Sequence, residues 1–405
     1  MNFRRYLYFG ACFLSLAGCK TVGNNRSVSH SLSDRSSVDV VSDSAPKLAL
    51  HDVSVLFPDD LDRGENYFLR PNSPGLGGEL LPKSFVDGLP VNDNKIHMAS
   101  FRIDPCFPRL EFLDSKPELC GAQVRLVFIP NISVIAHHAA YKLERATLEA
   151  MLKELAALGD HSDKGLAAPL GIHPKMAAEG IDGPTARAMR AIVLKYVGVA
   201  NLIGLASLEF PQAPTEWQFV PRLYADGKFV EQTIPTLTTT RENFTHIKRS
   251  ARVPGVTLPD PRNGFFVTGS SKVSRTESVK NPDTLALKTV LDDSLLMQAT
   301  QEELDKAFSH IAKLDNPNMT HFDNTPCVSC HISSGIESET FLRRNIEMKD
   351  GPNRYQSFLN LTQTSKGLRR FPEIRNFSHS KAISQRTVNE SAAVVEALIK
   401  HKYLK

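Results

Sequence analysis

The chain has 405 residues, of which 23% are charged, and a formal net charge of +4 at neutral pH. This length predicts two or three domains of roughly 150 residues each. The small net charge and the lack of basic blocks exclude the usual electrostatic footprint of a nucleic-acid-binding protein, so we expect no nucleic-acid partner.

Residues 1–18 are predicted to be a signal peptide. Two arginines precede a short apolar stretch, Tyr6–Ala17, whereas a membrane-spanning helix needs about 20 apolar residues. The stretch ends in LAGC at residues 16–19, which resembles the bacterial lipobox. The resemblance implies that Cys19 carries a lipid and becomes the new N-terminus. An ordinary signal peptide cleaved nearby is the alternative.

The lipobox resemblance also implies a location. Lys20 follows the cysteine, and in lipoproteins a residue other than Asp at this position favours the outer membrane. We therefore expect a protein held at the outer membrane through its N-terminal lipid, on the periplasmic side or exposed at the surface. Residues 19–47 are predicted to be a disordered tether, because a serine-rich stretch without aromatic residues cannot bury enough apolar surface to offset its ordering entropy.

Residues 48–255 are predicted to form an α+β domain. Alternating β-rich runs indicate strands, and apolar residues at helical spacing indicate helices. The expected strands are 52–57, 96–103, 123–129 and 201–210, and the expected helices are 139–158 and 184–197. Residues 217–234 are expected to form a hairpin, because Asp226-Gly227 suits the positive φ of a two-residue turn. The less regular residues 256–299 are interpreted as a connector.

Residues 300–405 are predicted to form a small helical domain. Thr300 and Glu303 have the spacing of a capping box at the start of an amphipathic helix that continues to about residue 314. A second amphipathic helix is expected at residues 384–399. The expected fold class is therefore an α+β N-terminal domain followed by a small all-α domain.

The sequence TPCVSCH at residues 325–331 lies between these two helices. Cys327, Cys330 and His331 have the C-x-x-C-H spacing of c-type haem attachment, in which both thiols bond to the porphyrin and the histidine binds the iron. A zinc site would need a second pair of ligands nearby, and a thioredoxin-type dithiol would need a βαβ setting. The motif predicts one covalent haem c, with Cys327 and Cys330 as thioether sites and His331 as the proximal ligand.

The predicted roles of the remaining cysteines are consistent with an exported protein. Cys12 leaves with the signal peptide, and Cys106 and Cys120 are natural disulfide partners in an oxidising periplasm. In the chain-entropy model, closing such a short loop contributes ~3 kcal/mol. Two free buried thiols are the alternative.

With their flanking helices and motif, residues 300–405 resemble a monohaem class I cytochrome c domain, over about a quarter of the chain. The chain as a whole resembles uncharacterised haem-bearing lipoproteins of Gram-negative bacteria, a likeness that implies no activity. The cytochrome c resemblance implies a methionine as sixth iron ligand, yet no methionine follows Met348. His379 occupies the equivalent place and is the candidate distal ligand. Met348 and an iron that is open or otherwise ligated are the alternatives.

Other candidate site residues have weaker patterns. His137 and His138 precede the expected helix and are interpreted as a partly exposed pair, because no carboxylate-plus-histidine spacing accompanies them. His321 and His401 are weaker candidates for the iron than His379. Four arginines could contact haem propionates or be ordinary solvated side chains: Arg343, Arg344, Arg369 and Arg370.

These patterns predict a lipid-anchored, periplasm-facing monohaem cytochrome that exchanges single electrons with a redox protein partner. Two filled axial positions favour electron transfer over ligand chemistry, and a second histidine in place of methionine predicts a lower haem potential. The alternative is a haem-based redox or gas sensor in which residues 48–255 bind the partner. A haem peroxidase with an open sixth site is a further alternative.

Overall fold

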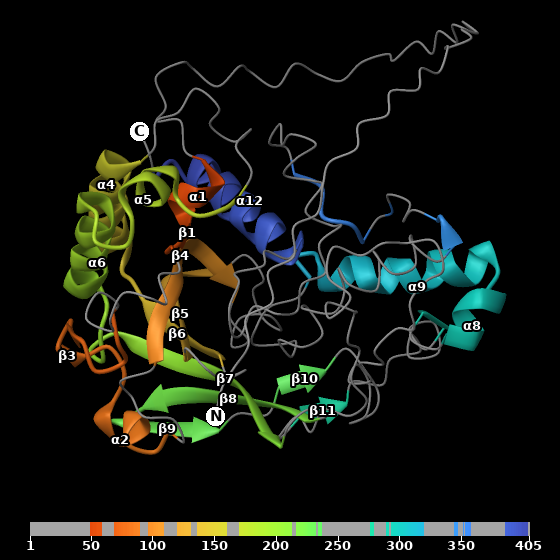
Figure 1. Cartoon of the computed structure of the whole chain (residues 1–405), viewed down its shortest axis with the longest axis horizontal. Helices are drawn as coiled ribbons and strands as arrows, with labels where there is room; N and C mark the ends of the chain where they lie inside the picture. The colour runs from red at the N-terminus through yellow and green to blue at the C-terminus, as the bar shows by residue number, and fades with distance from the viewer. Residues whose placement is uncertain are drawn as a thin grey trace, which may run out of the picture. The chain divides into compact units, whose positions relative to one another are not determined.

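The computed structural model describes much of the chain from residue 49 onward (Figure 1). The described residues are 49–58, 69–89, 96–108, 120–130, 136–159, 170–212, 216–231, 234–236, 276–278, 289–290, 293–319, 344–346, 351, 353–357 and 385–403. Within these ranges, no helix is long and apolar enough to cross a membrane.

A seven-stranded antiparallel sheet is the centre of the fold (Figure 1). Its strands, in spatial order, are β1 (Ser54–Leu56), β4 (Ile96–Pro108), β5 (Cys120–Pro130), β6 (Ala136–Lys142), β7 (Leu202–Gln212), β8 (Glu216–Ala225) and β9 (Lys228–Glu231). From β4 onward, spatial order follows chain order, so the sheet is a meander. The β8–β9 turn is Asp226-Gly227 with φ of 52° and 76°, which confirms the predicted hairpin turn.

Two small sheets accompany the large one. β2 (Pro74–Gly75) pairs antiparallel with β3 (Gly78–Glu79), and β10 (Ile234–Thr236) pairs parallel with β11 (Thr276–Ser278). A Cβ on Gly75 would lie 2.3 Å from the carbonyl oxygen of Val197. The hairpin of β2 and β3 therefore packs backbone to backbone against the chain that follows helix α6 (Pro184–Tyr196).

One face of the sheet is covered by helices from the middle of the chain. α4 (Arg145–Leu158) contacts α6 and β5, and α5 (Pro174–Glu179) contacts α6. Helices α4 and α6 both have an amphipathic pattern, because their apolar residues recur at helical spacing. The side chains of α4 that enter the core are Leu148, Met151, Leu152 and Leu155. They belong to the same core cluster as Val124, Leu126 and Phe128, which alternate along β5.

The last helix, α12 (Gln385–Lys400), meets the sheet near β1 and β4, where its residue Glu390 lies beside the opposite face. Successive side chains of a strand leave the sheet on opposite faces, so Arg125 lies on the face away from Val124 and Leu126. Arg125 reaches Glu390 of α12, and α12 also contacts β4 and the short helix α1 (Leu50–Val53). Figure 1 shows α12, in blue, beside α1.

Helices α8 (Asp293–Gln298) and α9 (Gln301–Leu314) come before α12 along the chain. Thr300 caps α9: its hydroxyl accepts the N–H of Glu303 at 3.3 Å, and the Glu303 carboxylate accepts the N–H of Thr300 at 2.7 Å. The predicted capping box is therefore confirmed. At the other end, the backbone oxygen of Asp315 accepts a hydrogen bond of 2.8 Å from Asn389 of α12.

The predicted fold class, an α+β domain followed by a separate small all-α cytochrome c-like domain, is wrong. Residues Ala45–Lys405 form one compact unit, and the apolar face of α12 enters the core of the sheet. The buried residues of that face are Val388, Ala392, Val395 and Leu398. Helical periodicity correctly predicts that α12 has an apolar face, but the pattern carries no information on which surface covers it.

Candidate functional site

The residues of the predicted haem and lipid sites lie outside the described part of the chain. They are Cys19, Cys327, Cys330, His331, Met348 and His379. The lipidation, thioether and iron-ligand assignments therefore stay predictions. His321, Arg343, Arg369 and Arg370 also lie outside it.

The predicted disulfide partners are described by their backbone alone. Cys106 lies in β4 and Cys120 in β5, and these strands are paired with Pro108 opposite Cys120. Cys106 lies in an irregularity of the register between Asp104 and Phe107, two residues before the residue opposite Cys120. Their side chains lie outside the described set, so the disulfide stays a prediction.

Arg344 binds the end of a helix. Its guanidinium donates to the backbone oxygens of Leu296, in the last turn of α8, and of Ala299, the latter at 3.1 Å. Cationic side chains are favoured at this end of a helix, because the last carbonyl groups have no intrahelical partner. This role accounts for the charge of Arg344 without a haem propionate.

A buried histidine–carboxylate cluster joins two distant parts of the chain. His51 and Asp52 are consecutive residues of α1, and His173 is the N-cap residue of α5. Nε2 of His173 lies 3.3 Å from Oδ1 of Asp52, and Nε2 of His51 lies 4.0 Å from the same oxygen. The two imidazole rings meet edge to face, with centroids 5.2 Å apart. All three side chains are almost completely buried.

The backbone around this cluster holds the three side chains in place. The second oxygen of Asp52, Oδ2, accepts the N–H of Ala49 at 2.7 Å, which turns Oδ1 toward the imidazoles. Next to His173, Ile172 forms a parallel bridge with Leu56 of β1. Burial opposes ionisation of Asp52, but His173, the Ala49 N–H and His51 together hold the pKa of the carboxyl below its usual range. Two imidazoles and an ionised carboxylate form a donor set that can hold a metal ion.

Sequence reasoning missed this cluster. Asp52 is the first residue of a predicted strand and His51 lies just before it, and His173 lies in a segment for which no element was predicted. The available signal was Pro174, a favoured residue at the first position of a helix, which places His173 at an N-cap. No spacing rule connects positions that are this far apart in sequence, so only the fold brings the three residues together.

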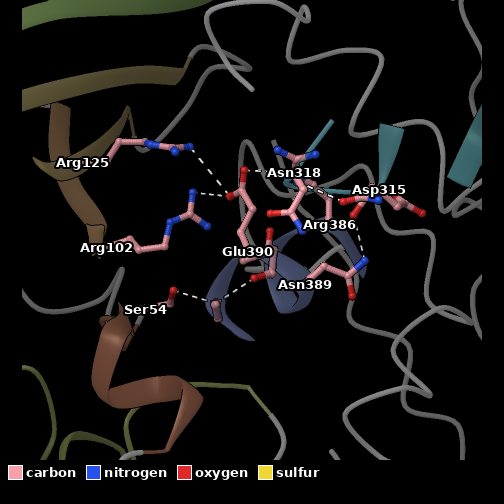
Figure 2. Close-up of polar contacts among 11 residues, drawn as sticks. Ser54, Arg102, Arg125, Asp315, Asn318, Arg386, Asn389 and Glu390 are labelled. Carbon is pink, nitrogen blue, oxygen red and sulfur yellow. Dashed lines mark hydrogen bonds and ion pairs between the residues drawn. The ribbon is translucent and has the colours of Figure 1, made fainter. Parts of the chain in front are cut away.

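A second buried cluster attaches α12 to the sheet (Figure 2). Arg102 of β4 and Arg125 of β5 are direct cross-strand partners, and like charges in such positions repel. Glu390 of α12 lies between them: it forms an ion pair with Arg102, lies 3.8 Å from Arg125, and accepts a hydrogen bond of 2.9 Å from Nε of Arg386. Beside them, the hydroxyls of Ser54 and Ser391 are hydrogen-bonded at 2.7 Å.

The electrostatics of this second cluster favour a structural role. Burial raises the pKa of Glu390, but the three arginines outweigh it and hold the pKa far below the ordinary value. Burial lowers the pKa of Arg102 to about 10, partly offset by Glu390. Glu390 and Arg102 are therefore both charged at neutral pH. Because the single carboxylate of Glu390 offsets the repulsion between the guanidinium groups around it, it stabilises the packing of α12 against the sheet.

His137 lies in a third buried position. The sequence-based interpretation of His137 and His138 as a partly exposed pair at a helix entry is wrong, because both lie in β6 and His137 is buried. Its Nδ1 is hydrogen-bonded to Ser207 at 2.9 Å, and Ser207 also accepts from Arg222 at 3.1 Å. Burial, and to a smaller extent Arg222, lowers the pKa of His137 to about 3.

Comparison with family models, with curated proteins and with solved structures found no match for this chain. The resemblances to a cytochrome c domain and to bacterial lipoproteins therefore rest on the sequence motifs alone.

Proposed function

We propose that this chain is a lipid-anchored c-type haem protein that transfers single electrons on the periplasmic side of the outer membrane. The observation that carries the proposal is the C-x-x-C-H motif at Cys327, Cys330 and His331. Two thiols and an imidazole at this spacing are the complete donor set for covalent attachment and proximal ligation of one haem. The proposal needs no separate cytochrome c domain.

The described residues that follow α9, before the motif, are held in the folded unit. Asp315 and Asn316, which follow α9, are buried. Asp315 accepts the hydrogen bond from Asn389 of α12, and the side chain of Asn316 donates to the backbone oxygen of Asn353 at 3.0 Å. The segment that follows α9 is therefore joined to α12 before the motif begins.

Covalent attachment is tested by making the chain in cells that mature c-type cytochromes. We expect one haem per chain by mass spectrometry of the denatured protein, and loss of the haem in the Cys327→Ala/Cys330→Ala variant. The matched control is Cys106→Ala/Cys120→Ala, which removes the same number of thiols and should retain the haem. A chain that carries no covalent haem under these conditions would contradict the proposal.

Electron transfer is tested through the sixth ligand. If His379 and His331 both bind the iron, the ferrous protein should bind carbon monoxide slowly, and His379→Ala should convert the low-spin spectrum to high-spin. Met348→Leu serves as the control. Rapid binding of carbon monoxide by the unmodified protein would favour the sensor, and turnover of peroxide would favour the peroxidase.

The anchor is tested separately through Cys19. The Cys19→Ala variant should lose the lipid-dependent mass and leave the membrane fraction, whereas haem attachment should persist. Retention of this variant in the membrane fraction would show that another part of the chain holds it there.

A further inference from the structure

The geometry of the His51, Asp52 and His173 cluster suits a single metal ion. Two ligand atoms that lie ~2.1 Å from a tetrahedral metal are roughly 3.4 Å apart. The distance from Nε2 of His173 to Oδ1 of Asp52 is 3.3 Å, and the distance from Nε2 of His51 to that oxygen is 4.0 Å. One ligand atom from each residue lies within 4.8 Å of the other two. We propose that these three side chains bind one divalent metal ion of the zinc class.

Burial supports a cation at this position. The relative exposures of His51, Asp52 and His173 are 1%, 7% and 0%, and a carboxylate removed from water needs a paired charge or a metal. Among the described residues, neither ring nitrogen of His173 has a hydrogen bond of good geometry. A buried imidazole without such partners is costly. A metal ion bound to Nε2 of His173 would give that nitrogen a partner and would supply the positive charge beside Asp52.

The chemistry of the three ligand side chains indicates which metal they would bind. Calcium and magnesium prefer oxygen ligands, so two imidazole nitrogens and one carboxylate oxygen favour zinc or ferrous iron. The ferrous sites with this donor set keep open positions for oxygen and substrate, whereas these side chains are enclosed in the core. We therefore assign zinc in a stabilising role, with the three side chains filling three of its four tetrahedral positions and one position left for a further ligand. The capping hydrogen bond from Ala49 to the other oxygen of Asp52 orients the carboxylate, as outer-sphere partners of metal ligands commonly do.

A metal ion at this site would join two short helices. α1 has four residues and α5 has six, and helices of this length are not stable alone. A metal ion that joins Asp52 to His173 would fix α1 to α5. Because α1 also contacts α12, the metal would help to hold the first described element against the last.

The test measures the metal content and thermal stability of the full-length protein with its haem attached. We expect close to one zinc ion per chain by mass spectrometry of the elements, in addition to the haem iron. His173→Gln and Asp52→Asn should lower the affinity for zinc by at least about tenfold. The matched control is His137→Gln, which replaces an equally buried histidine outside the cluster and should retain the metal.

A second measurement separates metal binding from a purely structural effect of the substitutions. After dialysis against a chelator, added zinc should raise the Tm of the wild-type protein and of His137→Gln, but not that of His173→Gln. Unchanged Tm on addition of zinc to the wild-type protein would overturn the proposal, as would an unchanged zinc content in both cluster variants.

The motif cysteines are the competing source of bound zinc. The Cys327→Ser/Cys330→Ser variant should retain the metal, and its cobalt-substituted form should lack a thiolate charge-transfer band. Loss of the zinc in this variant would assign the metal to the motif and overturn the proposal. The Cys327→Ser/Cys330→Ser variant cannot attach haem, so its zinc content tests the metal site separately from the proposed haem.

Discussion

Two arginine–glutamate pairs in this protein have the same geometry and different surroundings. Arg386 and Glu390 in α12, and Arg145 and Glu149 in α4, are both spaced four residues apart with Nε–Oε1 distances of 2.9 Å. The side chain of Glu390 is 15% exposed, whereas that of Glu149 is 44% exposed. Because the two pairs have the same geometry, we expect any difference in their contribution to stability to come from burial and from the additional partners of Glu390.

The first prediction compares these two glutamates. Glu390→Gln should lower the free energy of unfolding by about 3–5 kcal/mol, because it removes the buried anion that lies between Arg102 and Arg125. Glu149→Gln should change it by less than about 1 kcal/mol. Urea denaturation measures both. Equal losses in the two variants would show that the buried cluster contributes no more than a surface pair.

The second prediction concerns acid sensitivity at His137. Its pKa is lowered from the ordinary 6.5 to about 3 by burial, so in the folded state the imidazole stays neutral at pH values where the unfolded chain binds a proton. Its contribution is complete above pH 6.5. As the pH falls from 6.5 to about 3, the free energy of unfolding should decrease by up to ~1.4 kcal/mol per pH unit.

The measurement is chemical denaturation of the wild-type protein and of His137→Gln between pH 4.5 and 7.5. The variant should show a smaller decrease below pH 6.5. Glu390 does not contribute strongly in this range, because its depressed pKa makes its contribution decline only below the ordinary value of 4.5. Parallel pH profiles of the two proteins would mean that His137 is protonated in the folded state.

The predictability of individual elements depends on how local their determinants are. The capping box at Thr300, the hairpin turn at Asp226-Gly227 and the apolar stripe of α12 are set by residues within one or two turns of each other, and the structure confirms them. The expected helix at 139–158 starts too early, because residues Ala139–Lys142 belong to β6. Their composition favours a helix, but pairing with β5 and β7 outweighs local propensity.

The features that the sequence did not predict depend on contacts between distant segments. The partner of α12 is a sheet whose nearest strands, β1 and β4, lie at the start of the described chain. The histidine–carboxylate cluster likewise combines α1 with the N-cap of α5. Arg102 and Arg125 looked like ordinary strand residues, and only their direct register identifies the site that Glu390 fills. Each of these arrangements is a property of the tertiary fold.

At the scale of the whole molecule, the last helix and the sheet share one core. Val388, Ala392, Val395 and Leu398 of α12 belong to the same hydrophobic cluster as Val124 and Leu126 of β5 and as the buried residues of α4. Elements that share a core in this way should unfold together. A protein built as two independent domains would instead show two transitions, one for the sheet and one for the C-terminal helices.

The third prediction tests this coupling at two adjacent positions of α12. Leu398 is 0% exposed and Ile399 is 41% exposed. Leu398→Ala should lower the free energy of unfolding by about 2–5 kcal/mol, because it opens a cavity in the shared core, whereas Ile399→Ala should change it by less than about 0.5 kcal/mol. Hydrogen exchange of the amides in β5, which lies inside the sheet, should be accelerated by Leu398→Ala although the substitution is in the last helix. If β5 exchanged at the wild-type rate while only α12 lost protection, the helix and the sheet would be separate folding units.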